Sequence, residues 1–126
     1  MKCFALIITF SGLLNCFSGF HYTRFTFDLY ILDSNKKPIT TKLSYIISCN
    51  LVGWAENGQT DSSRIREQLY REYTEPSDFF GKGAELGIHV FRRDITIIDT
   101  LMRFDDIKFE TLPYDNFNYV DTFYVN

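Results

Sequence analysis

The stretch that decides the fold runs from Phe25 to Cys49 and reads FTFDLYILDSNKKPITTKLSYIISC. Apolar and polar residues alternate across 23–32 and again across 39–51, which is the two-residue period of a strand with one buried face. A helix would need apolar spacings of three and four, and neither run supplies them over its length. The Asp, Ser, Asn, Lys and Pro residues at 33–38 have turn chemistry. Together the two runs predict a β-hairpin.

The same alternation predicts which side chains face the core. They are Thr23, Phe25, Phe27, Leu29 and Ile31 in the first run, and Ile39, Thr41, Leu43, Tyr45, Ile47, Cys49 and Leu51 in the second. Because Cys49 belongs to this apolar face, we expect a buried and unreactive thiol.

The rest of the chain predicts further strands. Alternation recurs over 84–91, 95–104, 107–111 and 117–125, with turns rich in Gly, Pro and Asp between them. Composition predicts that 53–63 is a loop. About seven short strands with regular turns indicate an all-β domain, a single β-sandwich or barrel.

Residues 64–75 fit two structures. Ile65, Leu69 and Tyr73 recur every four residues, and Ser63 could cap a helix that begins after it. Every spacing is also even, so the same three residues would share one face of a strand. The all-β setting favours a strand, and one short helix around 63–75 stays as the alternative.

Size and charge exclude one class of function. The chain has 126 residues, which suits one domain, and 45% of them are hydrophobic, enough for a core without disulfides. The formal net charge is −3 and there is no run of Lys or Arg. Binding to nucleic acid therefore has no electrostatic support.

The first residues resemble an export signal. Lys2 forms a short basic region, 4–14 is apolar, and small side chains at Cys16 and Ser18 suit cleavage after Ser18. A membrane span would need roughly 20 apolar residues, more than this run has. A buried first strand is the alternative. We therefore expect a signal peptide over 1–18, a β-sandwich domain over 19–126, and a secreted or cell-envelope location, periplasmic or surface.

Cys16 offers a second form of export. Leu13-Leu14-Asn15-Cys16 resembles a relaxed bacterial lipobox, in which Cys16 would be lipidated and become the mature N-terminus. Asn15 departs from the small residue usual before that cysteine. Contact with a membrane is expected only through such a lipid anchor. In either form Cys49 is the single thiol left, so no internal disulfide is expected.

Two short motifs resemble a known family. The run 30–39, YILDSNKKPI, resembles the x-V-x-D-x-x-G-x-P start of transthyretin-like and carboxypeptidase-regulatory-like sandwiches, and 58–65 is similar to the T-[DN]-x-x-G-x-[IF] turn that follows there. The family glycine is replaced by Ser63 or Arg64. The resemblance implies a transthyretin-like or immunoglobulin-like sandwich of about seven strands. The hydroxyisourate hydrolases of that superfamily have a catalytic His at the position of Tyr30 and end in Tyr-Arg-Gly-Ser, whereas this sequence ends in TFYVN at 122–126. Their activity is therefore not expected.

Direct searches for catalytic patterns argue against an enzyme. His21 and His89 are the only histidines, G-x-S-x-G is absent, and His89 fits a surface position on a strand. No His and Cys spacing fits zinc, and no cofactor is expected. Seven carboxylates crowd residues 94–121 in the C-terminal third, and we interpret them as a solvated rim: Asp94, Asp99, Asp105, Asp106, Glu110, Asp115 and Asp121. Paired carboxylates for glycoside hydrolysis stay open, because their separation is spatial.

Aromatic residues give the candidate binding site. Trp54, Tyr114 and Tyr119 are candidates for a platform that binds sugars or peptides, and filling of the core is the alternative. We therefore expect an exported, non-catalytic module for binding or assembly at the cell envelope, with a protein or carbohydrate partner of unknown identity. The alternative is a small extracytoplasmic hydrolase that uses the C-terminal carboxylates. A third interpretation is an assembly subunit that adds an edge strand to a neighbour.

Overall fold

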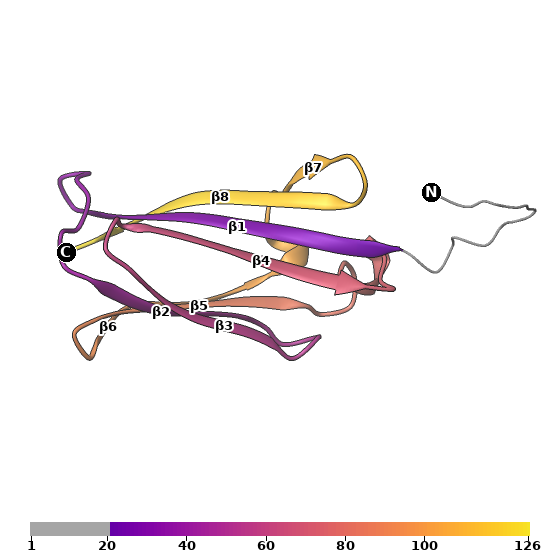
Figure 1. The fold of residues 1–126 in the computed structure, drawn as a ribbon, viewed down its shortest axis with the longest axis horizontal. Helices are drawn as coiled ribbons and strands as arrows, with labels where there is room; N and C mark the ends of the chain where they lie inside the picture. The colour runs from indigo at the N-terminus through magenta and orange to yellow at the C-terminus, as the bar shows by residue number, and fades with distance from the viewer. Residues whose placement is uncertain (1–20) are drawn as a thin grey trace, which may run out of the picture.

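The computed structural model describes residues 21–126, which form a β-sandwich of two packed four-stranded sheets (Figure 1). The first sheet has the order β4-β1-β8-β7 and the second β3-β2-β5-β6. The strands are β1 (Tyr22–Asp33), β2 (Leu43–Cys49), β3 (Trp54–Thr60), β4 (Arg64–Glu72), β5 (Glu85–Arg92), β6 (Ile95–Arg103), β7 (Glu110–Leu112) and β8 (Asn116–Val125). The prediction of an all-β sandwich is confirmed, with eight strands instead of about seven.

The described chain contains short 3-10 turns but no α-helix. These turns are η2 (Pro76–Asp78) and η3 (Phe104–Asp106). Accordingly, nothing in residues 21–126 is a helix long and apolar enough to cross a bilayer. The expected signal peptide over 1–18 and the lipidation of Cys16 lie outside the described residues.

The predicted hairpin is wrong, because its two strands lie in different sheets. β1 has β4 on one side and β8 on the other, so β2 has no place beside it. One bridge, Leu32 to Pro38, is all that pairs the two runs. Instead, Ser63 holds the second run: the Ile39 N–H donates to Ser63 Oγ over 2.6 Å, and Ser63 Oγ donates to the Ile39 carbonyl over 2.9 Å. The 33–42 connection therefore crosses from one sheet to the other.

One further segment differs from its prediction, and a second decides between two alternatives. Residues 53–63 were expected to be a loop, but β3 is a polar edge strand that pairs with β2 along its whole length. Hydrogen bonds to β2 are enough to make it a strand, although its own residues show no apolar alternation. Residues 64–72 form strand β4, so the strand alternative for that segment is confirmed and the helix is wrong. Tyr73 lies beyond its end, exposed and at a positive φ of 58°.

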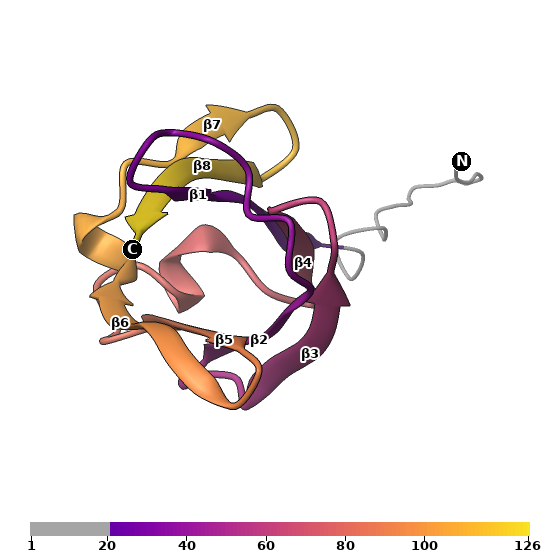
Figure 2. The ribbon, with the colours of Figure 1, turned by 90° about the vertical axis from the view of Figure 1, so that its left-hand side faces the viewer.

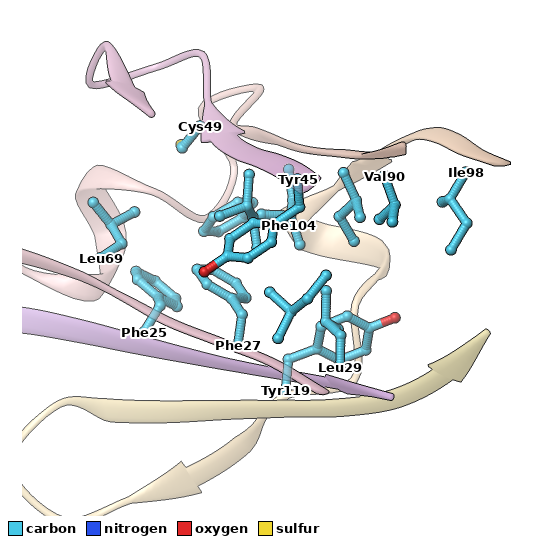
Figure 3. Close-up of a cluster of buried hydrophobic side chains, with 14 of the residues drawn as sticks. Phe25, Phe27, Leu29, Tyr45, Cys49, Leu69, Val90, Ile98, Phe104 and Tyr119 are labelled. Atoms are coloured by element: carbon cyan, nitrogen blue, oxygen red, sulfur yellow. The ribbon is translucent and has the colours of Figure 1, made fainter. Parts of the chain in front are cut away.

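The predicted core faces are largely correct. From β1 and the 39–49 run, Phe25, Phe27, Leu29, Ile31, Ile39, Leu43, Tyr45, Ile47 and Cys49 are all buried. Thr23 is buried as well. Two predicted positions are exceptions: Thr41 is only partly buried, and 40% of the surface of Leu51 is exposed. Phe25 lies at the centre of the core, with ring centroids 4.9 Å from Phe79, 5.0 Å from Phe104 and 5.2 Å from Phe117. Figure 3 shows β1 side chains reaching toward Tyr45 and Phe104.

The two long sides of the sandwich differ. On one side β3 passes through a short turn into β4, and the Tyr45 hydroxyl of β2 donates to the Glu67 carboxylate of β4, which joins the sheets. On the other side the sheets end in β6 and in β8 with its short neighbour β7, and η3 lies between them (Figure 2). This second side is the open side of the sandwich.

Candidate functional site

The open side exposes the backbone of β8. β7 pairs only with Asn116, Phe117 and Asn118, and within residues 21–126 no strand pairs with β8 beyond them on that side. Residues 104–109, which precede β7, do not continue along β8, because Phe104 and Phe109 turn into the core. Their ring centroids lie 5.0 and 5.2 Å from that of Phe25. Residues 119–125 therefore pair with β1 alone.

The direction of the free backbone groups follows from one hydrogen bond. The Arg24 N–H donates to the Asp115 carbonyl over 3.1 Å. Because alternate residues of a parallel ladder turn toward the same neighbour, the odd-numbered residues of β8 bond β1. The N–H and C=O groups of Val120, Thr122 and Tyr124 consequently point away from β1, toward the open side.

Asp121 covers part of this edge. One of its carboxylate oxygens accepts the Thr122 N–H over 2.8 Å, and the other accepts the Tyr119 hydroxyl. Burial and this hydrogen bond raise the pKa of Tyr119, which keeps the phenol neutral. An inward-facing charge on an edge strand is a known protection against unwanted strand pairing. The free donors that remain are those of Val120 and Tyr124.

A groove of about 600 Å³ lies beside the edge, between β8 and the segment from the end of β6 to Lys108. Its apolar lining residues are Leu101, Met102, Ile107 and Val120, and its charged ones are Arg103, Asp106, Lys108 and Asp121. Leu101 and Val120 expose 63% and 62% of their surface, and both line the groove. An apolar surface rimmed by both charges suits a protein segment better than a small ion.

The three predicted platform residues do not form one surface. Trp54 begins β3 and packs on the core, with its ring 5.9 Å from Phe27. Tyr114 lies in the β7–β8 turn, 85% exposed, beside a hollow shared with His21 and Tyr22. Of the three, Tyr119 alone lines the groove, and its ring is buried.

The structure also separates the C-terminal carboxylates. Asp106 and Asp121 line the groove, and the other five do not. Asp105 accepts the Gly81 N–H over 2.9 Å and lies 3.7 Å from Arg103. Asp99 lies 2.9 Å from the His89 ring. Among the described side chains no group of three or more His, Cys, Asp or Glu is placed to hold a metal ion.

Sequence reasoning missed the apolar part of the groove. Val120 and Leu101 lie on the solvent-facing side of their strands, where alternation would place a polar residue. Each is therefore an apolar residue out of pattern. That break is the one signal in the sequence that could have marked them. Their exposure depends on how far β7 extends, which the sequence pattern does not show.

Comparison with known proteins gives this chain no relative: no protein-family model, no curated protein and no solved structure matches it.

Proposed function

We propose that this protein is an exported binding or assembly module that takes an extended segment of a partner protein onto the free edge of β8. One observation carries the proposal: the backbone of residues 119–125 is unpaired toward the open side, and its first part, 119–121, lines a groove of apolar and charged side chains. A peptide added to a sheet edge gains main-chain hydrogen bonds, and its alternate side chains enter neighbouring pockets. Edge and groove together supply both.

The chemistry of the partner follows from the lining. Leu101, Ile107 and Val120 would receive apolar side chains at every second position of the added strand. Lys108 and Asp106 at the rim favour a partner that carries both charge signs. Docking displaces the Asp121 carboxylate from the Thr122 N–H, so a partner must offer a carbonyl in its place.

The extracytoplasmic part of the proposal rests on the sequence of residues 1–18. It is tested by the intact mass of the mature protein from its native host. A chain that begins at Gly19, or a lipidated one that begins at Cys16, supports export. A mass that still includes Met1 and Lys2 contradicts it. The transthyretin-like resemblance of 30–39 and 58–65 enters the proposal as a relation of fold, without an activity.

The binding test uses a short synthetic peptide in which valine alternates with threonine, added to the isotope-labelled protein at up to about 1 mM. We expect amide NMR shifts confined to residues 119–125 and the groove. Val120→Pro should abolish them, because it removes an outward N–H without breaking a bond to β1. Ile95→Lys is the matched control, since Ile95 is equally exposed on β6 but lies outside the groove.

Three results would contradict this function. The first is a set of shifts at the β3 edge instead of β8. The second is unchanged binding by the Val120→Pro variant. The third is a protein that is already a dimer with residues 119–125 protected, which would make a second copy the occupant.

The hydrolase alternative retains one favourable observation, since Asp106 and Asp121 share the groove. Both oxygens of Asp121 accept hydrogen bonds, which leaves Asp106 as the freer acid. Alanine at Asp105 and Asp106 separates the two functions. Hydrolysis of a carbohydrate substrate by Asp106 and Asp121 would be lost, whereas a bound peptide would lose one rim charge and keep its main-chain hydrogen bonds to β8.

A further inference from the structure

A hollow of about 350 Å³ lies on the outer face of the second sheet, over β3, β2 and β5, which are side by side in Figure 2. Its polar lining side chains are Ser44, Asn57 and Gln59, and its apolar ones are Ile46 and Phe91. We call it the outer hollow. It shares no lining residue with the β8 groove, and its volume is at the lower end of the range of small-molecule sites.

Strand pairing arranges these side chains in two rows. Gln59 of β3, Ser44 of β2 and Phe91 of β5 are directly opposite one another and form the first row. Asn57 and Ile46 form the second row, two residues along the same strands. The β5–β6 pairing shifts register at Phe91, a bulge of the kind that redirects a side chain. Since neighbouring strands lie about 4.8 Å apart and same-face residues about 6.8 Å, the two rows frame an area of about 10 by 7 Å.

The floor between the two rows is paired backbone. Tyr45 turns into the core, and Gly58 opposite it has no side chain. β2 is hydrogen-bonded to β3 on one side and to β5 on the other. A peptide lying here would therefore find no free main-chain groups, unlike a peptide on the β8 edge. Recognition at the outer hollow depends on side chains alone.

The polar side chains of the outer hollow are free to bind a ligand. Ser44 is partly exposed, and Asn57 and Gln59 are exposed. Within residues 21–126 the side-chain hydrogen bonds of this region are made by Tyr45 and Thr60 instead, which leaves these three groups open. Each amide offers donors and an acceptor, and the hydroxyl offers both. A ligand with neighbouring hydroxyl groups could satisfy all of them.

The remaining lining determines the class of ligand. All seven described residues that line the outer hollow are uncharged, so it has no group to pair with a phosphate, a carboxylate or a metal ion. Ile46 is 36% exposed and Phe91 is partly exposed, so apolar surface lies beside the amides. A neutral ring with an apolar C–H face and hydroxyl groups at its rim fits this lining, and a sugar ring has that chemistry.

A second hollow adjoins the first and indicates a ligand longer than one ring. It measures about 220 Å³ and is lined by Lys42, Gln59, Thr60 and Asp61. Gln59 therefore belongs to both hollows, and its amide can bond to groups on either side. Two sugar units joined in a chain would place one ring in each hollow.

We propose that the outer hollow binds a neutral polysaccharide chain. One sugar ring lies with its C–H face on Phe91 and Ile46, while Ser44 and Asn57 bond to its hydroxyl groups. Gln59 bonds to this unit and to the next one along the chain. This site is a second one, separate from the proposed peptide edge at β8, and it does not depend on that edge.

The test is an NMR titration of the isotope-labelled protein with cellotriose, maltotriose and chitotriose, each up to about 20 mM. At least one of them should bind with a Kd of about 1 mM or below, with amide shifts confined to residues 42–46, 57–61 and 91. The corresponding monosaccharide should bind at least about fivefold more weakly, because it lacks the contacts of the second hollow.

Single variants then locate the ligand. Asn57→Ala and Gln59→Ala should each weaken binding about fivefold, the effect of one lost hydrogen bond. Phe91→Leu keeps apolar bulk but removes the ring and should also weaken binding. Asn118→Ala is the matched control, since it removes an amide from the outer face of the other sheet, and it should leave the affinity unchanged. Thermal unfolding checks that every variant retains the fold.

Three results would overturn the proposal. One is the absence of shifts with all three trisaccharides, and another is full affinity of the Gln59→Ala variant. The third is a set of shifts at the outer hollow caused by the valine–threonine peptide and by none of the sugars. Val120→Pro, which removes the peptide edge, should bind the trisaccharide unchanged, so the two proposed sites can fail separately.

Discussion

Replacement of Gly58 by Ala tests how the closed side of the sandwich is built. An added Cβ at Gly58 would lie 2.3 Å from the hydroxyl oxygen of Tyr45 and 2.4 Å from its Cζ. Tyr45 is buried, so its rigid ring cannot move aside without leaving the core. The ring must then give up its hydrogen bond to Glu67, the contact that joins β2 to β4.

The magnitude follows from these two losses. Overpacking of a core costs about 1–3 kcal/mol, and a hydrogen bond to a charged group contributes about 1.5–3 kcal/mol. Alanine in a strand regains about 0.5–1 kcal/mol over glycine. We expect Gly58→Ala to lower the free energy of unfolding by about 3 kcal/mol, which is a fall in Tm of roughly 10–20 °C for a domain of this size.

The assay is urea unfolding followed by Trp54 fluorescence, in a double-mutant cycle with Tyr45→Leu. Leucine ends short of the clashing atoms, so Gly58→Ala should be nearly neutral in the Tyr45→Leu background. Two results would refute the reasoning: a loss below about 0.5 kcal/mol for Gly58→Ala alone, or the same loss in both backgrounds.

Three other predictions concern the core. Burial, and next the hydrogen bond to Glu67, raise the pKa of Tyr45 to about 12, against about 10 in the unfolded chain. The contribution of Tyr45 to stability is therefore complete below about pH 10 and is lost as the pH rises toward about 12. The free energy of unfolding, measured against pH, should lose this dependence in Tyr45→Phe. Burial also raises the pKa of the Cys49 thiol, so a thiol reagent such as DTNB should react with Cys49 only after denaturation, and fast reaction of the folded protein would contradict its place in the core. Phe25→Ala empties the centre of the aromatic cluster and should lower the free energy of unfolding by about 3–5 kcal/mol, against under about 0.5 kcal/mol for exposed Tyr114→Ala.

Local alternation predicted the inner faces of the strands well. Phe25, Phe27, Leu29 and Ile31 are all buried because a strand turns every second side chain to one side, whatever its neighbours are. The same reasoning located the strand that ends the chain. These features depend only on residues a few positions apart.

Strand partners could not be predicted in this way. β1 pairs with β8, so the two ends of the domain are neighbours in the sheet. The second predicted run does not pair with β1, because its first residue, Ile39, is held by Ser63 instead. β3 is a strand because β2 provides a complete ladder, although its own residues show no apolar period. Pairing over long sequence separations leaves no local pattern.

The candidate site depended on these long-range features. Tyr119 was identified from its ring, but its neighbours in the groove come from β6 and η3. The same aromatic signal marks Trp54 and Tyr114, which lie outside the groove. His89 and Asp99 meet only because β5 pairs with β6, which no spacing in the sequence indicates.

Amide hydrogen exchange along β8, measured residue by residue by NMR, tests the free edge most directly. We predict alternation: slow exchange at Tyr119, Asp121 and Phe123, whose N–H groups bond β1, and fast exchange at Val120 and Tyr124. Thr122 should be intermediate, because its N–H bonds the Asp121 carboxylate, and Asp121→Ala should make it fast. Uniform protection from Tyr119 to Val125 would mean that another strand covers this edge, and the proposed binding site would not exist.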